Sequence, residues 1–167
     1  SNLDKISSIL SERFPESNIV AVSYNKAITL TSSKSKGNID IFNFNSLDEL
    51  VQWSINIGSI DVIIEHCSNY KSHKLALFKE LFYYLSHNGI YFIEELHAKF
   101  IPQLNDCDGD GDDIIDLLHL INNINISPAN ERSKLDGNLV SLSNHIESVT
   151  IKRKLAIVEK TGLTYRG

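Results

Sequence analysis

Strands and helices alternate along the second half of the chain. Apolar runs at residues 60–65 (IDVIIE) and 90–95 (IYFIEE) flank residues 72–86, where apolar side chains recur at helical spacing. Because a strand, a helix and a second strand in this order form a βαβ unit, the two strands are expected to be parallel. Nearly continuous apolar strands are typical of a sheet covered by helices on both faces. The pattern therefore predicts an α/β protein.

The flanking segments extend this prediction. Further helices are expected at residues 3–14, 46–55 and 112–124, and further strands at 18–24, 27–31 and 39–44. The runs at 18–24 and 27–31 are compatible with a hairpin or with two separate strands. Residues 146–151 and 154–159 predict a C-terminal antiparallel hairpin. We expect a three-layer sandwich with a mostly parallel sheet that ends in this hairpin.

Composition limits the classes of partner. The length of 167 residues fits a single domain, residues 1–167, and the lack of Met suggests a piece excised from a longer protein. A net charge of −5 argues against a nucleic-acid or anionic-membrane surface. No apolar run approaches the length of a membrane span. The two cysteines, Cys67 and Cys107, are too few for a disulfide framework, so a cytoplasmic setting is expected.

Polar side chains gather where two neighbouring strands end. Glu65 and His66 end the first strand, Glu94 and Glu95 end the second, and His97 follows. Because ligands of open α/β sheets bind at the carboxyl ends of strands, this is the leading candidate site for metal or acid–base chemistry. Strand alternation points Glu94 and Glu95 to opposite faces, so at most one of them enters a crevice.

Three segments carry a family resemblance: DVIIEHCSN at 61–69, LALFKELFYYLSHNG at 75–89 and IYFIEEL at 90–96. They resemble class I S-adenosylmethionine (SAM) dependent methyltransferases, and within these the metal-dependent sugar O-methyltransferases of macrolides together with the cephalosporin hydroxylase-like proteins. That family has strands ending in Asp-Asp-Gly-Ser-His and Glu-Asp. The stretch 146–162 resembles its closing strand pair. The resemblance, over about residues 58–162, implies a Rossmann-like methyltransferase fold.

The same resemblance implies a metal site in altered form. The positions of the family's metal ligands fall on His66, Glu94 and Glu95, and the position of its general base falls on Asn69. An amide has no usable basic pKa, so Asn69 would occupy the catalytic position without accepting a proton. His97 is the other catalytic candidate. Imidazole at His66 suits Mn or Zn better than Mg, which prefers oxygen ligands.

The cofactor half departs further from the family. A SAM site of this type needs a glycine-rich turn after the first strand and an acidic residue at the end of the second. The chain has no glycine before Gly37, the run 27–31 ends without an acid, and the strand at 39–44, taken as the third, lacks the Asp that contacts adenine. We therefore expect a degenerate SAM site. The residues at these positions are Ser23, Tyr24, Asn43 and Asn45.

An acidic run at 106–113 (DCDGDGDD) matches the first six positions of a calcium loop. Its ligands would be Asp106, Asp108 and Asp110. The twelfth position, which needs a bidentate Glu, is Leu117. Two other interpretations are open: an acidic loop whose last carboxylates cap the following helix, and a mobile loop that gates the active site, as the resemblance implies.

The sequence as a whole indicates a methyltransferase-like domain with a degenerate SAM site, acting as a noncatalytic structural or interaction module of a biosynthetic enzyme. Its partners would be neighbouring protein domains, or a small-molecule or carrier-bound substrate. One alternative is an active, divergent O-methyltransferase that uses SAM and Mg or Mn on a sugar or natural product. A second alternative is a calcium-responsive binding module.

Overall fold

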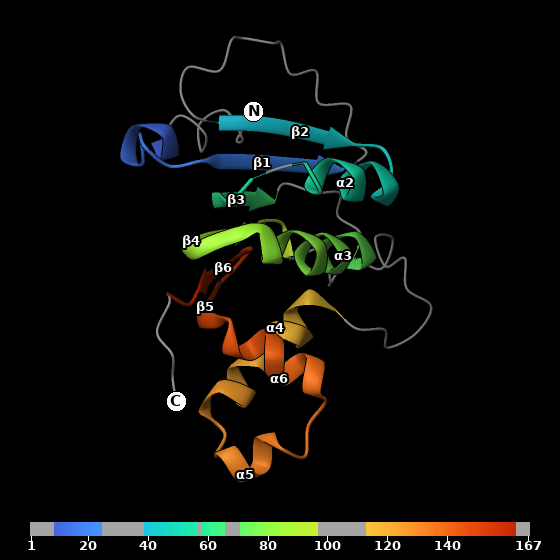
Figure 1. The fold of residues 1–167 in the computed structure, drawn as a ribbon, viewed down its shortest axis with the longest axis vertical. Coiled ribbons are helices and arrows are strands. Elements are labelled where there is room, and N and C mark those ends of the chain that lie inside the picture. The colour runs from blue at the N-terminus through green and yellow to red at the C-terminus, as the bar shows by residue number, and fades with distance from the viewer. Residues whose placement is uncertain (1–8, 25–38, 57, 66–70, 97–112, 163–167) are drawn as a thin grey trace.

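The computed structural model describes residues 9–24, 39–56, 58–65, 71–96 and 113–162 (Figure 1). They form a six-stranded sheet of order β2-β1-β3-β4-β6-β5. The strands are β1 (Ile19–Tyr24), β2 (Ile39–Phe44), β3 (Ile60–Glu65), β4 (Leu85–Ile93), β5 (Ile146–Lys152) and β6 (Leu155–Lys160). Strands β2, β1, β3 and β4 are parallel, whereas β6 is antiparallel to both β4 and β5. The predicted mostly parallel sheet with an antiparallel C-terminal hairpin is confirmed.

The helices lie along and beyond this sheet. They are α2 (Leu47–Ser54), α3 (Lys71–Leu81) with the 3-10 turn η1 (Phe82–Tyr84), α4 (Ile114–Ile126), α5 (Ala129–Arg132) and α6 (Gly137–Asn144). Figure 1 shows α4, α5 and α6 gathered beyond β5, at the end of the sheet opposite β2. Within the described residues, no helix has both the length and the apolar character that crossing a bilayer requires.

Both faces of the central strands are buried, as their continuous apolar runs predict. In β1, Val20 and Val22 belong to the large core that also contains buried residues of α2, α3 and α4. Their neighbours Ile19 and Ala21 belong to a smaller core on the other face, against which Phe14 packs. Because alternate strand residues point to opposite faces, this division fixes the register of the sheet.

Strand β2 lies directly beside β1, with register from Ile19 opposite Ile39 to Tyr24 opposite Phe44. The structure therefore places residues 39–44 directly beside the first strand, in the position of a second strand, and not in that of the third strand for which they were taken. The run 27–31, expected between them, lies outside the described residues. Periodicity identifies strands but not their order, which depends on contacts distant in sequence.

The first half of β4 contains an irregular stretch. Residues 85–90 of β4 run beside residues 60–62 of β3, and Asn88 has a φ of 60°. The Asn88-Gly89 pair, a dipeptide whose sequence is typical of turns, is thus a bulge inside the strand. Helix α3 correspondingly ends at Leu81, earlier than predicted. The Lys160 ammonium of β6 donates to the carbonyls of Tyr83 and Leu85 after the helix end, which supports this early end.

Gly89→Ala is expected to destabilise the protein. A Cβ at this position would lie 2.7 Å from Leu85 Cγ and 2.8 Å from the Ser86 carbonyl oxygen. Because backbone would have to move, the free energy of unfolding should fall by about 1–3 kcal/mol in urea denaturation. Gly137→Ala is the matched control, since nothing lies within 4 Å of its added Cβ and Ala favours the helix that it begins. Equal stabilities of the two variants would contradict the close packing at the bulge.

Candidate functional site

The strand order places the candidate site at the carboxyl ends of β1, β3 and β4. From β1, the next strand in the chain, β2, is added on one side of the sheet, and β3 is added on the other side. The order in which strands are added therefore reverses between β1 and β3. Ligands of open α/β sheets bind outside the carboxyl ends at such a switch point. Here β1 ends in Ser23-Tyr24 and β3 ends in Glu65. The carboxyl end of β4 adjoins that of β3, where the Glu94 N–H donates to the Glu65 carbonyl at 3.1 Å.

Glu65 is fully buried in this edge of the sheet, with 0% of its surface exposed. Its side chain forms an ion pair with Lys74 of α3, with 3.6 Å between Nζ and Oε1. The Tyr91 hydroxyl of β4 donates to Glu65 Oε2 at 3.3 Å. A buried carboxylate is tolerated only when paired and hydrogen-bonded, and these contacts supply both conditions. Glu65 therefore joins β3, β4 and α3.

Lys74 is also buried, with 2% of its surface exposed. Besides the ion pair, its ammonium donates to the Glu94 carbonyl at 2.6 Å. Lys74 is not among the site residues predicted from the sequence. A signal was present, because Lys74 precedes Leu77, Phe78 and Leu81 at helical spacing and so lies on the apolar face of α3. A lysine on a buried helix face requires an acidic partner on the sheet.

The acidic pair after β4 is at the same edge, as predicted. Glu94 and Glu95 are both half-buried, and Glu95 has a φ of 62°. A positive φ is uncommon for glutamate and ends the regular strand there. The expected strict alternation of these two side chains thus applies only up to Ile93, where β4 ends.

The remaining predicted residues divide into two groups. Ser23 and Tyr24 end β1, Asn43 lies in β2, and Asn45 follows β2. The other candidates, His66, Asn69, His97, Asp106, Asp108 and Asp110, lie outside the described residues, and their roles stay predictions. The last carboxylate of the acidic run is described. Asp113 caps α4 by accepting a hydrogen bond from the Ile115 N–H at 2.9 Å, which confirms the capping interpretation for this residue.

The described part of the site does not form a metal centre. No group of three or more His, Cys, Asp or Glu side chains suited to a metal ion occurs among the described residues. The positive charge of Lys74 contacts both Glu65 and the backbone of Glu94. An ammonium bonded to the Glu94 carbonyl disfavours a divalent cation beside it. His66, another of the expected ligands, lies outside the described residues, so the expected metal site stays a prediction.

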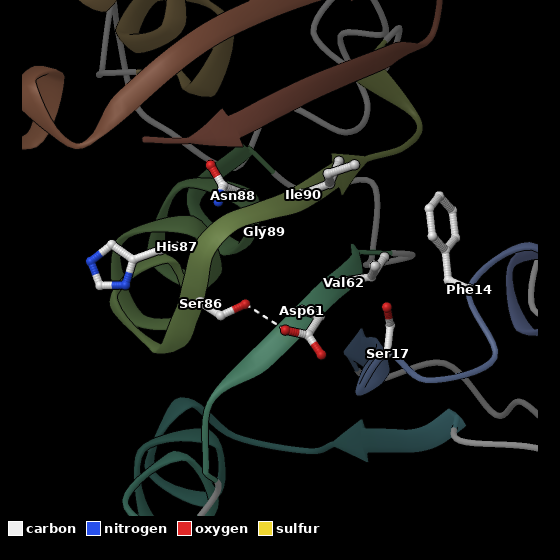
Figure 2. A pocket seen from close by; sticks show the side chains of 9 residues that line it. All are labelled: Phe14, Ser17, Asp61, Val62, Ser86, His87, Asn88, Gly89 and Ile90. Atoms are coloured by element: carbon white, nitrogen blue, oxygen red, sulfur yellow. Dashed lines mark hydrogen bonds between the residues drawn. The ribbon is translucent and has the colours of Figure 1, made fainter. Parts of the chain in front are cut away.

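A pocket of about 170 Å³ lies at the other end of the central strands, near the amino ends of β1 and β3. Figure 2 shows it between the amino-terminal half of β3 and the bulge of β4, with His87 pointing away from Asp61. Asp61 accepts hydrogen bonds there from the Asn18 N–H at 2.8 Å and the Ser86 hydroxyl at 2.6 Å. This carboxylate fastens β3 to the start of β1 and to β4. The pocket is smaller than the roughly 300–1,000 Å³ of typical ligand sites, and it lies away from the carboxyl ends.

Comparison with solved structures shows that the chain has a methyltransferase-like fold. One similar structure is MycE methyltransferase from the mycinamycin biosynthetic pathway in complex with Mg, SAH and mycinamycin VI, at a TM-score of 0.65 and 14% identity over 96% of this chain and 50% of that chain. A crystal form of MycE with Mg and SAH has a TM-score of 0.65 and 16% identity over 95% and 51%. A second crystal form has a TM-score of 0.66 and 14% identity over 97% and 49%.

The chain therefore spans about half the length of these neighbours. Its sequence matches no protein-family model and no curated protein. At such low identity the likeness establishes the fold alone.

Removing one charge of the buried pair is expected to destabilise the protein. Lys74→Met removes the ion-pair partner of the buried Glu65 carboxylate, and the free energy of unfolding should fall by about 3–5 kcal/mol in urea denaturation. Combining it with Glu65→Gln removes both charges, and the double variant should lose less than about 2 kcal/mol. Lys79→Met, at an exposed position of the same helix, should change stability by less than about 0.5 kcal/mol. Additive effects of the two single substitutions would contradict a coupled pair.

Proposed function

We propose that this chain is the methyltransferase-fold part of a larger enzyme of natural-product biosynthesis, and that its SAM site is degenerate. In this role it acts as a noncatalytic structural or interaction module in the cytoplasm. The proposal is carried by one observation, the position of β1. Because β1 borders the switch point, the residues that follow β1 in sequence are the ones that would approach the cofactor. Gly37 is the first glycine of the chain, so the sequence directly after β1 lacks the residue that permits close backbone approach.

The end of β2 supports the same proposal. As the strand beside β1, β2 occupies the position from which the family supplies an acid to the ribose, and it is followed by Asn45. The first acidic residues after it, Asp48 and Glu49, lie in the first turn of α2. Glu49 Oε2 accepts a hydrogen bond from the Asn45 N–H at 2.9 Å, so this carboxylate supports the start of the helix.

The size of the neighbours supports a role within a larger protein. A chain that spans about half of each MycE chain leaves room for a further domain beside it. We propose neighbouring protein domains as its partners, with a small-molecule or carrier-bound substrate held by the assembly. Nucleic acid and membrane are excluded from this proposal, because the net charge of −5 disfavours binding to anionic polymers and surfaces.

A second candidate function is an active, divergent O-methyltransferase of a sugar or natural product. The observation that favours it is the SAH and Mg bound in the MycE structures. In such an enzyme, SAM would supply the methyl group near Ser23 and Tyr24. The described residues of this chain would then orient the cofactor through Asn43 and Asn45 at the end of β2.

Isothermal titration with SAM and with SAH separates the two candidates. The module is expected to bind neither ligand more tightly than about 100 µM, roughly −5.5 kcal/mol, with or without Mg, Mn and Ca. A cooperative thermal transition of the same sample shows that the protein is folded. Stoichiometric binding below this value, weakened by Tyr24→Ala and unaffected by Asn130→Ala on the exposed face of α5, would establish the methyltransferase candidate instead.

A further inference from the structure

A positive charge is already built into the acidic edge of the sheet. The Lys74 ammonium lies 3.6 Å from Glu65 Oε1 and 2.6 Å from the Glu94 carbonyl oxygen, and the residue is 2% exposed. It therefore connects Glu65, the last residue of β3, to Glu94, which follows the last residue of β4. These are the two strand ends at which the resemblance expects a divalent metal.

The ammonium is held firmly in this position. A buried lysine loses its hydration, so its charge must be compensated by protein groups. Here the compensation comes from one full negative charge on Glu65 and one carbonyl dipole on Glu94. Lys74 projects from the first turns of α3, and that helix is anchored by the buried side chains of Leu77, Phe78 and Leu81. The helix therefore fixes the ammonium between the Glu65 carboxylate and the backbone carbonyl of Glu94.

We infer that Lys74 replaces a divalent metal at the carboxyl ends of β3 and β4. Its single charge compensates Glu65, the carboxylate that would otherwise attract a cation to this end of the sheet. A divalent cation would have to displace the ammonium, which α3 holds in place. The acidic edge is therefore stable without metal, and binds Mg or Mn poorly. The inference is independent of SAM binding, because metal affinity is measured without the cofactor.

The test is a titration with Mn²⁺ followed by electron paramagnetic resonance of the free ion. All proteins carry Asp108→Asn and Asp110→Asn, so that the acidic run at 106–113 does not bind the ion. The parent is compared with Lys74→Met and with the Glu65→Gln/Lys74→Met double variant, which removes both charges of the pair. Lys79→Met, at an exposed position of α3, is the matched control for loss of a lysine.

We expect weak Mn²⁺ binding by the parent, by the Lys79→Met control and by the double variant, which loses one positive and one negative charge together. Lys74→Met should bind Mn²⁺ at least about tenfold tighter, because the Glu65 carboxylate is left without its counter-charge. Glu94→Gln or Glu95→Gln in Lys74→Met should abolish the gain. The melting temperature of the parent should be the same in EDTA and in Mg²⁺. The inference is overturned if the parent binds one Mn²⁺ as tightly as Lys74→Met, if Lys74→Met produces no gain, or if Mg²⁺ raises the melting temperature of the parent.

Discussion

The buried contact between Glu65 and Lys74 is the interaction on which the carboxyl edge of this fold depends. It joins the last residue of β3 to α3, and through the Tyr91 hydroxyl and the Glu94 carbonyl it reaches β4. The three elements would pack through their apolar residues in any case. The pair adds a constraint on the position of α3. If α3 moved along the strands, each charge would be buried without the other, which is unfavourable by several kcal/mol. The pair thus sets how α3 lies over the two strands.

The type of each element could be predicted from the sequence where hydrophobic periodicity alone determines it. Strand β3 and the β5–β6 hairpin have their expected bounds within one residue. The prediction was weaker where distant contacts decide. The end of α3 depends on an ammonium from β6, and the Asn88-Gly89 bulge depends on register with β3. Neither partner is close in sequence, so local patterns gave a longer helix and a turn in place of a bulge.

The candidate site also contains residues that could be predicted from local sequence patterns and residues that could not. Glu65, Glu94 and Glu95 could be placed together from sequence, because parallel strands bring their carboxyl ends to one edge. The order of the strands in the sheet could not be obtained this way. The strand that contains Asn43 and precedes Asn45 was therefore taken as the third, although it lies beside β1. Lys74 was missed for another reason. Lysine is ordinarily a surface residue, and its burial becomes evident only when its position on the apolar face of α3 is considered.

The two edges of the sheet use charge in opposite ways. At the amino edge, the carboxylate of Asp61 accepts from a backbone N–H before β1 and from a hydroxyl of β4, so a negative group connects three segments through neutral donors. At the carboxyl edge, a cation connects two strands through a carboxylate and a carbonyl. A metal ion would supply a comparable connection, but only while it is bound. A lysine supplies it permanently, and at the cost of the Lewis acidity that a metal would bring to catalysis. Lys74 therefore suits a fold in which β3 and β4 must be linked but metal catalysis is not required. This agrees with the proposed noncatalytic role.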